Sequence, residues 1–190
     1  ALHLMILFAC VLALLPAQER WDDTPRPGIA VEDRSSASLV NLASLGVGNA
    51  TGLGWSGYMN GSGNMDHTVH VTAGWFAYNY RDFADKANHE FALGFPLYQG
   101  LYFGTGLRWD KNEKVGWNTH LLYRPATWMS LGIKGESLNR SPWMDWGVGV
   151  RPLAFNSFWE SRLTLFYDAR VTSGGNYANL AAGFRTEPLD

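Results

Sequence analysis

The sequence is poor in charged residues, in lysine and in cysteine. Charged residues make up 17% of the 190 residues, and only four of the fifteen basic residues are lysine. Soluble domains average about 25% charged residues, so a surface built mainly from charged side chains is excluded. The single cysteine, Cys10, excludes a disulfide framework and a cysteine-ligated metal site. The formal net charge of -2 offers no basic surface, so nucleic acid is not an expected partner.

A helical hydrophobic period is also missing from the chain after its first residues. The sequence contains 21 Gly, 9 Trp, 8 Tyr and 10 Phe. Glycine costs about 1 kcal/mol inside a helix, whereas aromatic side chains favour strands. This composition excludes a helical bundle and a disordered chain. The length fits one domain built from β-strands.

The first residues differ from the rest of the chain. Leu2 to Leu15 form an uncharged apolar run that is too short to span a membrane, and Pro16 and Ala17 follow at once. This pattern predicts a truncated signal peptide over residues 1–18 and hence export. We expect a plug-like N-terminal segment over residues 19–48 and one β-domain over residues 49–190.

Alternation of side-chain type predicts strands throughout that β-domain. In residues 101–109, Leu101, Phe103 and Leu107 fall on one face, while Gly104 and Arg108 fall on the other. The same split recurs in residues 117–124, 129–134, 145–151 and 159–168. Residues 50–59 and 69–80 predict further strands, the second divided in two if Ala73 and Gly74 form a tight turn.

Turns and connections fall into two kinds. Strands are expected to end at Pro96, Pro125, Pro152 and Pro188, where proline opens a short turn. Longer polar connections are expected over residues 110–115, 137–142 and 170–176. Short turns on one side and longer polar loops on the other are typical of a transmembrane barrel.

The face opposite the apolar one carries glycine, serine, tyrosine, histidine and asparagine with few charges, rather than the many lysines and glutamates of a water-exposed face. We therefore predict an all-β, antiparallel up-and-down transmembrane β-barrel with about 8–10 strands present, incomplete at its end. Its expected place is the outer membrane of a Gram-negative-type bacterium, with membrane lipid as partner. A secreted soluble β-barrel that binds a ligand is the alternative, because such domains also alternate.

Charged side chains on the polar face are the candidate functional residues. One interpretation is a permeation lining; the other is a set of ion pairs that neutralise one another inside a narrow barrel. Cross-strand neighbours on one face approach to about 5 Å, so the arginines are expected near the carboxylates. The candidates are Arg108, His120, Arg124, Lys134, Glu136, Asp145, Arg151, Glu160, Arg162 and Asp168.

Other chemistry finds little support in the sequence. Asp66, His67 and His70 lie close together, but an extended strand places the two histidines on opposite faces, so no metal site is expected. His89 and His120 could act as bases, but the sequence has no Gly-x-Ser-x-Gly elbow and no phosphate-binding loop. We expect no catalytic residue and no cofactor in this chain.

Residues 31–46, VEDRSSASLVNLASLG, lie just before the first predicted strand. The segment resembles the N-terminal signature of outer-membrane barrels of the fatty-acid transporter (FadL-like) and PorV-like group, which carry an Asn-Pro-Ala-x-Leu box. Asn41, Ala43 and Leu45 match the box, and Leu42 stands in place of its proline. The segment is also similar to the N-terminal region that precedes SppA-like signal peptide peptidases, and residues 93–104 are similar to both groups.

The resemblance implies a conduit or a binding-dependent transporter for small or apolar molecules. Similarity to the peptidase-linked region implies an alternative, in which the barrel anchors a larger protein whose active domain follows Asp190.

Overall fold

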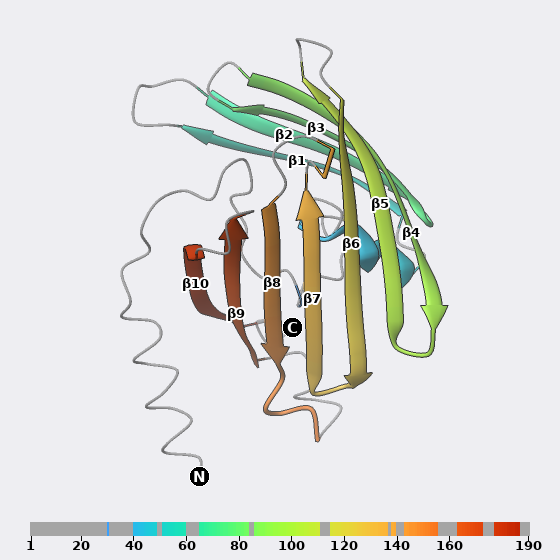
Figure 1. Cartoon of the computed structure of the whole chain (residues 1–190), viewed down its shortest axis with the longest axis vertical. Helices are drawn as coiled ribbons and strands as arrows, with labels where there is room; N and C mark the ends of the chain where they lie inside the picture. The colour runs from blue at the N-terminus through green and yellow to red at the C-terminus, as the bar shows by residue number, and fades with distance from the viewer. Residues whose placement is uncertain are drawn as a thin grey trace.

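The computed structural model describes residues 30, 40–48, 51–59, 65–83, 86–110, 115–136, 138–139, 143–155, 163–172 and 177–186. Ten antiparallel strands form a single sheet in which each strand pairs with the next one along the chain (Figure 1). The strands are β1 Thr51–Met59, β2 Met65–Ala73, β3 Phe76–Phe83, β4 Lys86–Tyr98, β5 Leu101–Asp110, β6 Val115–Ala126, β7 Met129–Glu136, β8 Trp143–Val150, β9 Leu163–Thr172 and β10 Tyr177–Thr186. The prediction of an all-β, up-and-down arrangement is confirmed.

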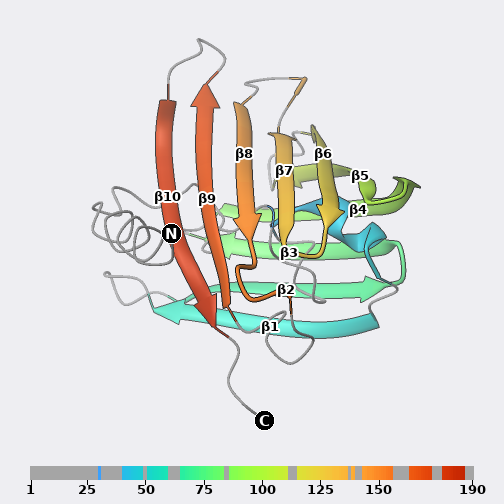
Figure 2. The same cartoon turned by 90° about the horizontal axis from the view of Figure 1, so that it is seen from below.

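The sheet is strongly curved (Figures 1 and 2). Its two faces have opposite character. Its inner face, defined by buried side chains such as Asn79, Glu90 and Asp145, is polar. Its outer face, defined by exposed side chains such as Phe91 and Ile133, is apolar. Alternation along each strand produces the separation, because successive side chains point to opposite faces. Of the apolar residues expected on the outer face, Leu107, Leu121 and Ile133 are exposed, while Gly104 and Gly132 opposite them are buried.

The connections between the strands lie at two ends of the sheet. At one end, the turn end, β2 and β3 are joined at Gly74 and Trp75, and β4 and β5 at Gln99 and Gly100. The other end, the loop end, holds the connections over residues 60–64, 84–85, 111–114, 137–142 and 173–176. The longest connection, over residues 151–162 between β8 and β9, lies at the turn end, so the two ends do not divide into short turns and longer loops as expected. Gly74 has a φ of 61°, a left-handed conformation that glycine adopts without strain. The expected division of this stretch by a tight turn is therefore confirmed, but the turn lies at Gly74 and Trp75, one residue later than Ala73 and Gly74.

Two of the four prolines, Pro96 and Pro125, do not open turns as expected. Pro96 and Pro125 lie inside β4 and β6, ahead of the turns, where the strand pairing shifts between Pro96 and Tyr98 and between Tyr123 and Ala126. Proline lacks the N–H that a ladder requires, so it is accommodated at such irregularities. Pro152 does lie in a turn, directly after β8, and Pro188 lies outside the described residues.

The sheet is open in the described part of the chain, since β1 pairs only with β2 and β10 only with β9. The described residues contain no helix that is both long and apolar enough to cross a membrane.

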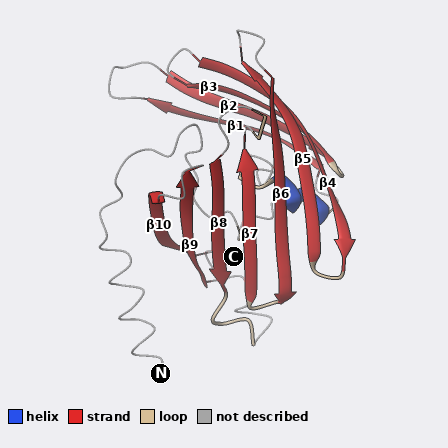
Figure 3. Cartoon of the chain, in the orientation of Figure 1, coloured by secondary structure: helices blue, strands red, loops and turns tan. Residues whose placement is uncertain are grey.

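One short 3-10 helix, η2 (Leu42–Gly46), packs against the inner face and contacts β4, β5 and β6 (Figure 3). Leu42 and Leu45 form a small buried apolar cluster with Ala77 and Ala92 of the sheet. The other buried side chains of the inner face are mostly polar. The buried apolar cluster of the described residues therefore lies at the contact between η2 and the sheet.

Candidate functional site

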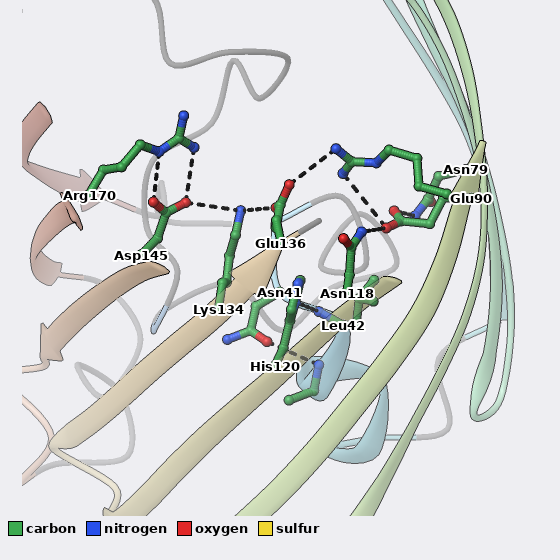
Figure 4. A network of polar contacts seen from close by, with 12 residues as sticks. Asn41, Leu42, Asn79, Glu90, Asn118, His120, Lys134, Glu136, Asp145 and Arg170 are labelled. Atoms are coloured by element: carbon green, nitrogen blue, oxygen red, sulfur yellow. Dashed lines mark hydrogen bonds and ion pairs between the residues drawn. The ribbon is translucent and has the colours of Figure 1, made fainter. Parts of the chain in front are cut away.

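A belt of buried ionic side chains crosses the inner face from β3 to β9 (Figure 4). Its first centre is Glu90 of β4, which is 2% exposed. Asn79 Nδ2 donates to Glu90 Oε2 at 3.1 Å, and Asn118 Nδ2 donates to Oε1 at 2.7 Å. Arg81 and Arg108 lie 3.6 and 3.7 Å from the two carboxylate oxygens. The buried carboxylate thus has two amide donors and two cations around it.

Arg108 carries the belt across β6 to Glu136 of β7. Its Nη1 donates to Glu136 Oε2 at 3.1 Å. The two residues are not on adjacent strands, because β6 lies between them. The register partner of Arg108 on β6 is Gly116, which has no side chain to obstruct the guanidinium. The expected approach of Arg108 to Glu136 is confirmed, but over one intervening strand.

The belt continues through Lys134 and Asp145 to Arg170. Lys134 Nζ lies 2.7 Å from Glu136 Oε1 and 3.5 Å from Asp145 Oδ2. Arg170 donates to both oxygens of Asp145, from Nε at 2.7 Å and from Nη2 at 3.0 Å. Its guanidinium carbon also lies 5.0 Å from the centre of the Trp143 ring, within cation–π range. Asp145 is thereby bound by two cations from neighbouring strands.

The order of charges along the belt alternates strictly. From β3 to β9 the sequence is Arg81, Glu90, Arg108, Glu136, Lys134, Asp145 and Arg170. Each carboxylate contacts two cations, so none is left as an isolated buried charge, which would cost several kcal/mol. No group of three His, Cys, Asp or Glu among the described residues could hold a metal ion. The arrangement suits electrostatic neutralisation of the buried carboxylates.

His120 of β6 connects the inner face of the sheet to η2. The Leu42 backbone N–H donates to His120 Nδ1 at 2.7 Å, so this nitrogen is unprotonated and the ring proton lies on Nε2. Asn41 caps η2, since its side-chain oxygen accepts from the Ala43 backbone N–H at 3.0 Å. Two of the first backbone donors of η2 are thereby satisfied by buried side chains.

Glycines on β4 and β5 allow η2 to approach the sheet closely. A methyl group at Gly104 would overlap the Leu42 carbonyl carbon and the Ala43 nitrogen, and one at Gly94 would overlap the Leu42 carbonyl oxygen. At Gly106 the contact would be 2.8 Å from Leu42 Cδ1. Backbone atoms cannot yield as a flexible side chain can, so docking of η2 requires glycine at positions 94 and 104.

Replacing His120 by phenylalanine should loosen η2. The substitution keeps a ring of similar size but leaves the buried Leu42 N–H without an acceptor, which costs about 1–3 kcal/mol. We expect faster hydrogen–deuterium exchange over residues 41–47 and a lower unfolding temperature. His67→Phe is the matched control, because His67 lies on the outer face; exchange that rises equally in both variants would contradict the role of His120.

The structure brings together part of the predicted set of charged residues. Arg108, His120, Lys134, Glu136 and Asp145 belong to the belt or to its contact with η2. Arg151 and Asp168 are buried and Arg124 is half-buried. Glu160 and Arg162 lie outside the described residues, as do the predicted signal peptide and the Asp66 side chain.

Several belt residues are absent from the predicted set. The candidates do not include Arg81, Glu90 and the amide Asn79, nor Asn118, which alternation places on the polar face. Arg170 is expected in a loop but belongs to β9. The signal was present in the sequence, since Asn79 and Arg81 alternate with Tyr78 and Tyr80 as strand residues do. His67 and His70 face opposite sides of β2, as the sequence predicts.

The comparisons with protein-family models, with curated proteins and with solved structures find no match to this chain.

Proposed function

We propose that the sheet is the wall of an outer-membrane β-barrel that serves as a conduit for small molecules, with η2 as a plug on its inner side. The observation that carries the proposal is that the polar and apolar faces of the sheet are reversed relative to those of a soluble β-domain. The apolar side chains of the sheet face outward, and its ionic side chains are buried inside. A soluble β-domain has the opposite arrangement, whereas a membrane barrel needs an apolar exterior and tolerates a polar interior.

Strand length and aromatic placement support the same proposal. The strands contain 8 to 13 residues, and a tilted strand of about 9–11 residues crosses the hydrocarbon core of a bilayer. Exposed rings such as Phe76, Tyr98 and Trp128 lie at or beside the turn end. On β6 and β7, aliphatic residues such as Leu121 and Ile133 lie between the turn that contains Trp128 and the loop end. Aromatic residues at membrane boundaries with an aliphatic band between them are typical of membrane barrels.

The belt itself favours a second candidate, in which the barrel is closed and only anchors a larger protein. Its charges bind one another, and η2 occupies the inner face over β4 to β6. Because η2 occupies the inner face, a conduit would require η2 to move before molecules could pass. Conductance of the chain in planar bilayers separates the two candidates, because an anchor passes no current in any state of η2.

Membrane insertion is tested by fluorescent labelling of single cysteines, introduced into the full chain after the native Cys10 is replaced by serine, in phospholipid vesicles. We expect labels at L121C and I133C to be quenched by lipids that carry a bromine atom in mid-chain, because both positions face outward between the strand ends. The matched control is Q99C in the β4–β5 turn, where no quenching is expected. The proposal would be contradicted by a chain that stays in the aqueous phase or by equal quenching at all three positions.

A further inference from the structure

The outer face carries a second cluster, separate from the belt, at the loop end of β2 to β5. We call it the outer ring cluster, and it lies where β3 and β5 end and where β2 and β4 begin. Its members face outward and are half-buried: His67, Tyr78, Tyr80, Asp82, His89 and Trp109.

The rings of this cluster form a continuous row across three strands. Tyr80, His89 and Trp109 are register partners on β3, β4 and β5. The ring centres of Tyr80 and His89 are 5.1 Å apart, and those of His89 and Trp109 are 5.5 Å apart with an interplanar angle of 13°. His67 extends the row on β2, with its ring centre 5.6 Å from that of Tyr80. The row therefore presents a broad aromatic surface.

Polar atoms accompany these rings. The Tyr78 hydroxyl lies 2.7 Å from His89 Nδ1, and the Tyr80 hydroxyl donates to Asp82 Oδ2 at 3.4 Å. Asp82 is also the register partner of His67. Asp82 keeps a second carboxylate oxygen with lone pairs for a further donor, and the hydroxyls and imidazoles can both donate and accept. The cluster combines ring faces with hydrogen-bonding groups of both kinds.

On β4 and β5, the outward side chains become purely apolar in the next register row, two residues further from the loop end. The next register row on β4 and β5 consists of Phe91 and Leu107, which are 60% and 52% exposed. At the turn end, exposed rings such as Phe76, Tyr98 and Trp128 are present as well, but no described outward side chain there is charged or a histidine. An ordinary aromatic boundary explains the turn end but not the imidazoles and the carboxylate at the loop end.

We infer that the outer ring cluster binds the saccharide headgroup of a glycolipid, an inference that rests on the proposed membrane location. Sugar rings place C–H groups against aromatic faces, while their hydroxyls need acceptors and donors such as Asp82 and His89. Phe91 and Leu107, directly adjacent, fit the acyl chains of the same molecule. A lipid with a phosphate head and no sugar has no C–H face to place against the rings of Tyr80, His89 and Trp109, so it would use only part of the cluster.

The test uses the full chain in phosphatidylcholine nanodiscs with purified lipopolysaccharide as the probe, captured by a tag on the chain and washed. We expect the wild-type chain to retain lipopolysaccharide, and Asp82→Asn and Trp109→Ala to reduce its apparent affinity about tenfold, the loss of one good contact. Trp128→Ala, at the turn end, is the matched control and should bind as the wild type does. Phosphatidylglycerol in place of lipopolysaccharide should not be retained.

Each result decides between the proposals. Equal retention by all variants, or equal loss in Trp128→Ala, would overturn the saccharide site. Asp82→Asn is nearly isosteric and should fold, so its affinity for lipopolysaccharide tests the saccharide site even if Trp109→Ala fails to fold. Failure of the chain to enter nanodiscs would overturn the proposed membrane location together with this inference, whereas entry without lipopolysaccharide retention would overturn this inference alone.

Discussion

Replacing Glu90 by alanine should destabilise the protein more than any other single substitution in the belt. The variant leaves Arg81 and Arg108 without the carboxylate that lies between them, and it removes the acceptor of Asn79 and Asn118. Loss of one partner from a buried ionic network costs about 3–5 kcal/mol. We expect a loss of that size in the free energy of unfolding, measured by urea titration in detergent micelles.

Two further variants make this result specific. Asp82→Ala removes a half-buried carboxylate of the outer face with a single 3.4 Å contact, so it should cost less than about 1 kcal/mol. Glu90→Gln keeps one oxygen acceptor and should fall between the two. If Glu90→Ala were no more damaging than Asp82→Ala, the belt would not stabilise the sheet.

Replacing Gly104 by alanine should expel η2 from the inner face. The added methyl group would overlap backbone atoms of Leu42 and Ala43, and neither strand nor helix can relieve the clash by a rotamer change. Overpacking of this kind costs about 1–3 kcal/mol. In a chain whose native Cys10 is replaced by serine, we expect Ala43→Cys, at a position buried in the parent chain, to react with maleimide when it is combined with Gly104→Ala.

The same variant separates a conduit from an anchor. If the barrel is a conduit that η2 closes, Gly104→Ala should raise the conductance of planar bilayers, and if it is only an anchor, the conductance should stay at zero. Gly48→Ala is the control, because no atom lies within 4 Å of a methyl group there. An unreactive cysteine at position 43 in the Gly104→Ala chain would show that the glycines do not control docking.

Much of the sheet could be predicted from local sequence. Alternation has a period of two, so it places Leu121 and Ile133 on one face and Gly132 and Lys134 on the other without knowledge of the strand order. Proline positions were less informative, because Pro96 and Pro125 mark irregular pairing just before a turn rather than the turn itself. Whether proline lies at a bulge or in a turn depends on the partner strand, which local sequence does not specify.

The belt could be predicted only in part. Lys134 and Asp145 are register partners on adjacent strands, and their pairing follows from alternation and a hairpin. The contact between Arg108 and Glu136 depends on Gly116 of the strand between them, and the bond from Leu42 to His120 joins residues 78 positions apart. Such contacts require the three-dimensional curvature of the sheet, so no spacing rule reveals them.

The belt also has a consequence for how the strands find their register during folding. A strand that slips by two residues keeps its apolar side chains outward, so hydrophobic patterning alone does not penalise this error. The same slip would remove Glu90 from its partner Arg108, and Asp145 from Lys134 and Arg170. Each mispaired arrangement would bury unmatched charges at a cost of several kcal/mol. The alternating charges therefore favour the native strand register over registers that are shifted by two residues.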